Sequence, residues 1–242
     1  MADGDLRQGQ TPATSESSAT DKILVWDLPV RIFHWALVLA VLGAFITDRL
    51  GVTYFKYHVW CGYTVLVLVA FRLIWGFVGT YHARFLNFVR GPKAILNYAR
   101  GSEKKLAGHN PLGALMVVVL LAGLAVQAVT GLFGNDEIFN VGPLYGYISN
   151  DLSLELTSLH RKLFYWIAGA IAFHIVAVIF YRIVKKEKLI EAMFTGRKAE
   201  VAREEGIASS RIYLALAIVI IVSVLLAWLI ATAPIPVVDV EY

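Results

Sequence analysis

The chain has 242 residues, is 58% hydrophobic and only 17% charged, and carries a formal net charge of +4. A soluble domain of this length needs a more polar surface, so the composition indicates an integral membrane protein. The single cysteine, Cys61, excludes a disulfide framework, an all-cysteine iron–sulfur site and the C-x-x-C-H attachment of a c-type haem. Any haem would be held by axial ligands and packing, as a b-type haem is. The small positive charge needs no nucleic-acid partner to explain it.

Residues 1–22 are rich in Ser, Thr, Ala, Asp and Gln and lack apolar periodicity, which predicts a disordered tail. The tail has no basic start, apolar run or small-residue cleavage site, the three features of a signal peptide. We therefore expect the first hydrophobic helix to remain in the mature protein.

Five hydrophobic segments follow, and each is long enough for a helix to cross a bilayer. They cover about residues 31–50, 57–79, 111–133, 158–181 and 211–232. The third begins at Asn110 and Pro111, where a proline suits the first turn of a helix. The sequence thus predicts an all-α integral membrane protein with five transmembrane helices.

Basic residues in the loops predict the orientation of these helices. The loop between the second and third segments and the stretch after the fourth are rich in Lys and Arg, whereas the loop at 134–157 contains neither. That loop carries acidic residues instead, namely Asp136, Glu137, Asp151 and Glu155. We therefore place the N-terminus in the cytoplasm and the C-terminus on the far side of the membrane.

The fourth segment carries two histidines, His160 and His174. Fourteen residues of helix bring them to within about 40° of one face and separate them by about 21 Å along the axis. In a hydrocarbon core of roughly 30 Å, one imidazole lies near each surface. His58, at the start of the second segment, shares the outer depth with His160. His34, near the start of the first, shares the cytoplasmic depth with His174.

Ionisable residues inside a membrane span indicate function, and two histidine pairs at two depths are what bis-histidine ligation of two haems requires. The alternative is that these are ordinary interfacial histidines near helix ends. His174 fits that alternative least well, because apolar residues surround it over nearly two turns on both sides. A zinc site is a weaker competitor, since zinc usually gathers three or four ligands at one depth. For His82 and His109, in or beside the basic loop, we expect a solvated or interfacial position.

Three arginines lie close to these histidines in the sequence or on the same helix face. Arg161 follows His160, Arg31 lies one turn before His34, and Arg72 shares the face of His58 fourteen residues further on. Haem propionates are anionic, and a buried arginine is costly unless an anion meets it. We therefore expect the three arginines to bind haem propionates. The alternative for Arg72 is a side chain that snorkels to the cytoplasmic headgroups.

A family resemblance is carried by five runs: VWDLPVRIFHW (25–35), HVWCGYTVLVLVAFRLIWGFVG (58–79), GHNPLGALM (108–116), LHRKLFYWIAGAIAFH (159–174) and LIEAMFTGRK (189–198). Over about residues 23–198 the chain resembles the bacterial cytochrome b561 and nickel–iron hydrogenase cytochrome b family. The resemblance implies a four-helix membrane bundle with two b haems. It implies His34 with His174 on the cytoplasmic-side haem and His58 with His160 on the outer haem. The gamma subunit of respiratory formate dehydrogenase is similar, with the same spacing in its last ligand helix.

This gives three expected regions: a cytoplasmic tail at 1–22, a di-haem four-helix domain at 23–198, and a linker, fifth transmembrane helix and short periplasmic tail at 199–242. The fifth helix has no histidine and no buried charge, so we expect it outside the haem core. The resemblance also implies a bacterial inner (cytoplasmic) membrane.

The sequence shows no nucleophile, general-base pair or nucleotide motif, so the expected function is electron transfer across the membrane. The family implies a quinone at one end and an extrinsic partner at the other, such as a periplasmic c-type cytochrome or a hydrogenase. A homo-oligomer is compatible with the sequence. His109 and Asn110 could hydrogen-bond a quinone near the His34/His174 haem, although Asn110 could equally serve only as a helix cap. The acidic loop could dock a basic partner or simply be solvated.

Two other functions remain open from the sequence. A superoxide oxidase-like superoxide:quinone oxidoreductase needs an open basic funnel at the outer face, against which the acidic outer loop argues. A haem-free membrane anchor or assembly subunit with structural histidines belongs to a different class.

Overall fold

The computed structural model describes residues 22–101, 108–198 and 206–234. Within these residues, five helices are long and apolar enough to cross a membrane, which confirms the predicted all-α membrane fold. They are α1 (Leu28–Arg49), α2 (Phe55–Val78), α5 (Pro111–Leu132), α6 (Asn150–Ile183) and α8 (Ile212–Ala231). Most of the predicted tail at 1–22, much of the linker after residue 198 and the C-terminal stretch from 235 lie outside the described residues.

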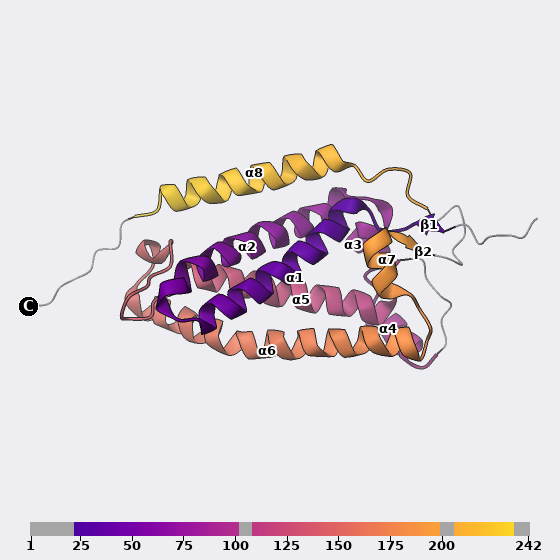
Figure 1. The fold of residues 1–242 in the computed structure, drawn as a ribbon, viewed down its shortest axis with the longest axis horizontal. Helices are drawn as coiled ribbons and strands as arrows, with labels where there is room; N and C mark the ends of the chain where they lie inside the picture. Colours follow the sequence, from indigo (N-terminus) through magenta and orange to yellow (C-terminus); the bar gives the residue numbers. More distant parts are fainter. Residues whose placement is uncertain (1–21, 102–107, 199–205, 235–242) are drawn as a thin grey trace, which may run out of the picture.

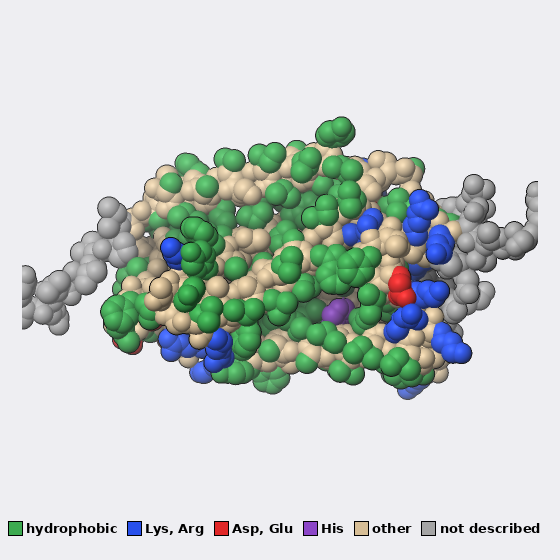
Figure 2. Space-filling model, in the orientation of Figure 1, with side chains coloured by type: hydrophobic (Ala, Val, Ile, Leu, Met, Phe, Trp, Pro, Cys, Tyr) green, Lys and Arg blue, Asp and Glu red, His purple; other side chains and the backbone are tan. Residues whose placement is uncertain are grey.

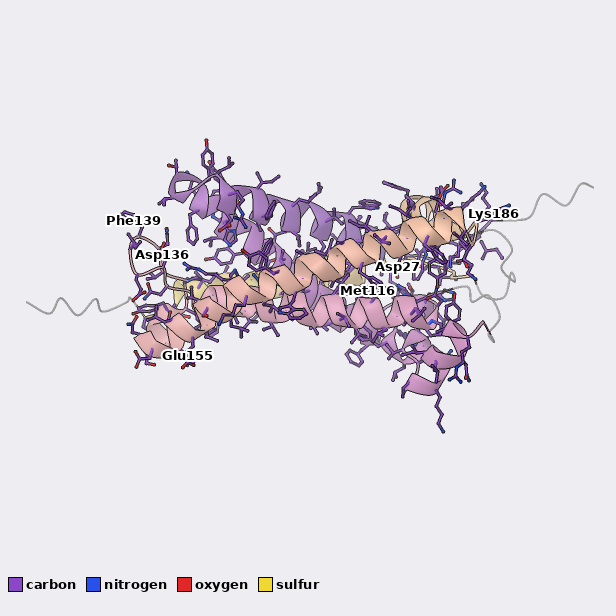
Figure 3. All side chains as sticks on the ribbon, turned by 90° about the horizontal axis from the view of Figure 1, so that it is seen from below. Asp27, Met116, Asp136, Phe139, Glu155 and Lys186 are labelled. Atoms are coloured by element: carbon purple, nitrogen blue, oxygen red, sulfur yellow. The ribbon has the colours of Figure 1, made fainter. Side chains whose placement is uncertain are left out.

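The long helices run alternately up and down between two ends of an elongated bundle (Figure 1). One end, which we call the sheet end, carries a two-stranded antiparallel sheet that pairs β1 (Ile23–Leu24) with β2 (Arg197–Lys198). The other, the loop end, carries the α5–α6 connection at residues 133–149. Figure 3 shows Asp136, Phe139 and Glu155 at the loop end and Asp27 and Lys186 toward the sheet end.

The short elements lie at these two ends. The loop end has two 3-10 helices, η1 (Val52–Tyr54) and η3 (Tyr145–Tyr147). The sheet end has η2 (Tyr81–Ala83), α3 (Phe85–Phe88), α4 (Pro92–Ala99) and α7 (Leu189–Thr195). Gly196 ends α7 with a φ of +80°, and an added Cβ there would lie 2.7 Å from the Trp26 carbonyl oxygen. A glycine is therefore required where the sheet folds back over the start of α1.

Helix starts follow the capping residues in the sequence. The Asp27 carboxylate accepts a hydrogen bond from the Val30 N–H (2.7 Å), and the Asn110 side chain accepts one from the Gly113 N–H (2.7 Å). Helix α6 begins at Asn150, eight residues before the predicted start at 158. The hydrophobic pattern marks only the membrane-spanning part, whereas the Ser149 cap starts the helix earlier, and Ser153 in its first turn donates to the Phe133 carbonyl (2.6 Å).

Packing pairs α1 with α2 and α5 with α6, and α2 also contacts α5 and α8. The most tightly buried side chains, among them Val25, Val69, Phe71 and Trp75, lie mainly toward the sheet end. Helix α8 lies against α2, on the outside of the other four long helices (Figure 1). Its only buried residues are Ala215 and Ile218, both in its first two turns.

Candidate functional site

The first candidate site is a pair of histidines in ring-to-ring contact near the loop end. His58 comes from the first turn of α2 and His160 from the third turn of α6. Their ring centroids are 6.3 Å apart, and the two ring planes make an angle of 77°. Although 102 residues separate them in the sequence, the fold brings the two imidazoles close together, with their ring planes nearly perpendicular.

Backbone carbonyls determine which nitrogen of each ring is free. The Nδ1 atom of His58 lies 2.9 Å from the Ala44 carbonyl oxygen, and that of His160 lies 2.8 Å from the Gln127 carbonyl oxygen. A carbonyl oxygen only accepts, so each Nδ1 carries the proton. Each Nε2 is then left as an unprotonated nitrogen that can bind a metal, the usual arrangement for ligating histidines.

The spacing of this pair fits a single metal ion held from both sides. With a metal–nitrogen bond of about 2 Å and a distance of roughly 1.2 Å from Nε2 to the ring centre, two opposed imidazoles have centroids about 6 Å apart. The observed 6.3 Å agrees with this value. The residues present therefore fit a bis-histidine haem iron.

Two glycines shape the space around the pair. An added Cβ at Gly131 would lie 3.0 Å from Cε1 of His160, so the lack of a side chain there lets the α5 backbone approach the ring. Gly62 lies one turn after His58 on the same face of α2, and an added Cβ there would meet no atom within 4 Å. A flat ring system can therefore approach the α2 backbone beside His58.

His34 and His174 form a second, wider pair toward the sheet end. Their imidazoles interact electrostatically, but no ring-to-ring contact joins them, unlike the first pair. The Nδ1 atom of His34 is buried and has no hydrogen-bond partner in the described part of the chain. The His34 ring thus keeps one buried nitrogen that no described residue uses.

Arg72 is buried rather than snorkelling, since only 2% of it is exposed. Its guanidinium lies over the rings of Phe85 (4.9 Å) and Phe88 (5.7 Å) and interacts electrostatically with Asp27 and His109. The Nη1 atom is buried without a hydrogen-bond partner among the described residues. A buried cation with a free donor can bind an anionic group that enters this region.

The other two predicted propionate donors have different surroundings. Arg31 is half-buried, donates from Nη2 to the Phe194 carbonyl oxygen, and keeps a buried Nε that has no partner in the part of the chain described. Arg161 is exposed beside His160 at the loop end.

His109 is half-buried at the start of α5 and packs against Trp26 (ring centroids 4.5 Å apart) and Phe88 (4.6 Å). Burial, followed by the positive charges of Arg72 and Lys198, lowers the pKa of His109 to about 3. The ring is therefore neutral at pH 7, and its buried Nδ1 has no partner within the described residues. The neighbouring Asn110 uses its side-chain oxygen to cap α5.

Sequence reasoning missed Asp27, which is only 1% exposed. Its carboxylate accepts hydrogen bonds from the Val30 N–H, from Nε1 of Trp75 (3.1 Å) and from the Thr80 hydroxyl. Asp27 stands two residues before Pro29, a pattern that predicts a helix start but gives no sign of the other two donors. Gln127, whose Oε1 is buried without a partner in the described ranges, could have been noticed as a polar residue inside an apolar span.

No group of three or more His, Cys, Asp or Glu side chains that could hold a metal ion occurs within the described ranges.

Comparisons with known proteins identify a family. A family model described as prokaryotic cytochrome b561 matches residues 25–196. The "Probable Ni/Fe-hydrogenase B-type cytochrome subunit" of Azotobacter vinelandii is 26% identical over 214 aligned residues, covering 72% of this chain and 87% of the relative. The protein of the same name from Rhodobacter capsulatus is 25% identical over 220 residues, covering 73% and 81%.

The "Probable Ni/Fe-hydrogenase 1 B-type cytochrome subunit" of Escherichia coli K12 is 24% identical over 212 residues, covering 72% of this chain and 90% of the relative. No solved structure matches significantly. Because the family model spans most of the chain and all four predicted ligand positions, the chain belongs to the prokaryotic cytochrome b561 family and is a membrane electron-transfer protein of the b-haem type.

Proposed function

We propose that this chain is a di-haem cytochrome that carries electrons across the membrane between a quinone pool and an extrinsic redox partner. The observation that carries the proposal is the His58/His160 pair, with each Nδ1 bonded to a carbonyl and each Nε2 free. These two residues would hold the haem at the loop end, and His34 and His174 the haem at the sheet end. The bound haem iron supplies the one-electron redox step.

Two buried arginine nitrogens support the haem at the sheet end. Arg72 and Arg31 each keep a buried donor nitrogen without a partner in the described residues. Such donors suit the anionic propionates of a haem. Along α6, the fourteen residues from His160 to His174 separate the two depths by about 21 Å, so one haem would lie near each membrane surface.

The distribution of charge supports a cytoplasmic sheet end. Figure 2 shows most of the visible Lys and Arg side chains around the sheet end, with a smaller group at the loop end. The residues that follow α6, including Arg182, Lys185 and Lys186, are basic, whereas the α5–α6 loop has no Lys or Arg. By the positive-inside rule, the N-terminus is cytoplasmic and the C-terminus periplasmic in a bacterial inner membrane.

For the quinone we propose a place beside His109. Its neutral imidazole has an unpartnered Nδ1, and it interacts electrostatically with both Arg72 and His174. A neutral ring nitrogen can hydrogen-bond a quinone oxygen without a charge being buried. Asn110 contributes by capping α5, which fixes the backbone that carries His109.

The extrinsic partner would dock at the loop end. Asp136 accepts hydrogen bonds from the N–H groups of Ile138, Phe139 and Asn140 (2.8–3.0 Å), which orders the loop and leaves Ile138 and Phe139 about three-quarters exposed. Burial alone would raise the pKa of Asp136, but these hydrogen bonds hold it well below its usual range. An acidic loop with an apolar tip suits a basic redox protein. The names of the relatives suggest a hydrogenase, and a c-type cytochrome is the other candidate.

The experiment is a haem count on protein purified in detergent, with a reduced-minus-oxidised spectrum. We expect a b-type α-band and two haems per chain. His160→Ala and His174→Ala should each remove one haem, while the control Tyr165→Ala, an exposed residue of α6, should keep both. A content of one haem or none in the unaltered protein, or two in His174→Ala, would refute the two-pair assignment.

A further inference from the structure

A groove runs between α2 and α8 in the half of the bundle near the loop end. Helix α8 lies alongside α2 and separates from it toward the loop end (Figure 1). The space between them has a volume of about 620 Å³. Its lining includes Tyr63, Thr64 and Leu68 of α2 and Val219, Ser223 and Ala227 of α8. The walls are thus apolar with a few hydroxyl groups.

A second hollow, of about 540 Å³, continues this groove to the surface of the loop end. It lies between the first turns of α2, which contribute Lys56 and Trp60, and the loop segment 139–141. Tyr63 lines both spaces. The α2 residues that line them recur every three or four positions from Lys56 to Leu68, so they form one stripe along the helix.

This stripe is separate from the histidine site. Lys56 and His58 are two residues apart, which places them about 200° apart around the helix axis. His58 points to Ala44 of α1 and to His160 of α6, whereas Lys56 faces the hollow under segment 139–141. The groove therefore belongs to neither proposed haem site.

The length of the groove matches one leaflet of a bilayer. Its α8 wall extends from Val219 to Ala231, which is about 18 Å at the helical rise per residue. Half of a hydrocarbon core is roughly 15 Å thick. A transmembrane helix of a partner would extend through both leaflets. In the half of the bundle near the sheet end, however, α8 packs on α2 through Ala215 and Ile218. A single lipid molecule fits this one-leaflet shape better than a helix does.

The surface hollow favours a negatively charged headgroup. Lys56 is the charged side chain in its lining, which otherwise includes Asn140, Thr53 and Trp60. Lys56 has no carboxylate partner within 4 Å in the described residues, and its contact is with the ring of Tyr57, 4.9 Å from the ammonium. A cation beside indole and amide donors at the membrane surface suits a lipid phosphate.

We infer that this groove binds one anionic phospholipid, with its phosphate at Lys56 and an acyl chain between α2 and α8. The lipid would fill the part of the α2–α8 interface where protein packing is absent, and it would thereby hold the fifth helix against the bundle. This site is independent of haem and quinone binding.

The test uses delipidated full-length protein in detergent and native mass spectrometry, with phosphatidylglycerol and zwitterionic phosphatidylcholine as the probes. We expect one tightly bound phosphatidylglycerol, held about fivefold more tightly than phosphatidylcholine. Lys56→Gln should abolish this preference. Lys162→Gln is the matched control, because Lys162 is also exposed and, like Lys56, lies two residues from a histidine at the same end; it should leave the preference unchanged.

A second pair of variants tests the acyl-chain groove. Ala227→Phe fills the groove and should weaken binding of both lipids, whereas Ala217→Phe, on an exposed part of the same helix, should not. Haem content is measured in parallel, because Lys56→Gln should leave it at the level of the unaltered protein. Three results would overturn the inference. They are equal affinity for the two lipids, an effect of Lys162→Gln as large as that of Lys56→Gln, and an equal loss of lipid affinity in Ala227→Phe and Ala217→Phe.

Discussion

Replacing Asp27 with alanine should destabilise the sheet end of the bundle. The carboxylate is buried where three segments meet, and it accepts hydrogen bonds from Val30 of α1, Trp75 of α2 and Thr80 of the following turn. It also interacts electrostatically with the buried Arg72. Alanine removes all of these interactions and offers no acceptor in their place.

The expected loss of unfolding free energy follows from the three hydrogen bonds that the Asp27 carboxylate accepts. Loss of a helix N-cap costs about 1 kcal/mol. The Trp75 indole N–H and the Thr80 hydroxyl would each be left buried without a partner, at about 1–3 kcal/mol each. Arg72 would also lose its nearby anion, which raises the cost of burying its charge. We therefore expect Asp27→Ala to lower the free energy of unfolding by at least about 3 kcal/mol.

The assay can use Cys61, the one cysteine of the chain, which is half-buried. A thiol-reactive fluorophore reports its exposure as the detergent-solubilised protein is heated. For a chain of this size, each kcal/mol lowers the midpoint temperature of unfolding by roughly 2 °C or more. The midpoint of Asp27→Ala should therefore fall by at least about 6 °C.

The matched control is Asp48→Ala at the other end of α1. The Asp48 side chain is 55% exposed, and it pairs with Arg49 at 3.7 Å. Its loss should change stability by no more than about 0.5 kcal/mol. If Asp27→Ala shifted the midpoint no more than Asp48→Ala does, the buried hydrogen bonds of Asp27 would not be supporting the fold.

Two further predictions concern His109 and Gly131. Burial and nearby cations lower the pKa of His109 from 6.5 to about 3, so the unfolded chain binds more protons between these values. Its contribution to stability is fully present above pH 6.5 and is lost as the pH falls, by about 2 kcal/mol between pH 7.5 and 5. His109→Gln should flatten this part of the pH–stability curve, and an unchanged slope would contradict the assignment. Gly131→Ala places a Cβ 3.0 Å from the His160 ring, so it should shift the midpoint potential of one haem only. The control Gly123→Ala meets the flexible Ile167 side chain at 3.3 Å and should shift the potential of neither haem.

The sequence predicts the helices well because their signals are local. Hydrophobic length identifies each span, and the capping pattern at Asn110 and Pro111 marks where α5 begins. The start of α6 is the clear error. Hydrophobicity ends where the membrane ends, but a helix ends where its backbone groups find other partners, and Ser149 and Ser153 supply them beyond the apolar stretch.

The sequence by itself determined that His160 and His174 share one helix face at two depths, because the period and rise of an α-helix are constant. Only the tertiary structure decided how these histidines are used. The carbonyls that orient His58 and His160 belong to α1 and α5, and the interaction of Arg72 with Asp27 and His109 joins segments from 37 to 45 residues apart. Such contacts depend on how whole helices pack, and no local pattern of residues encodes them.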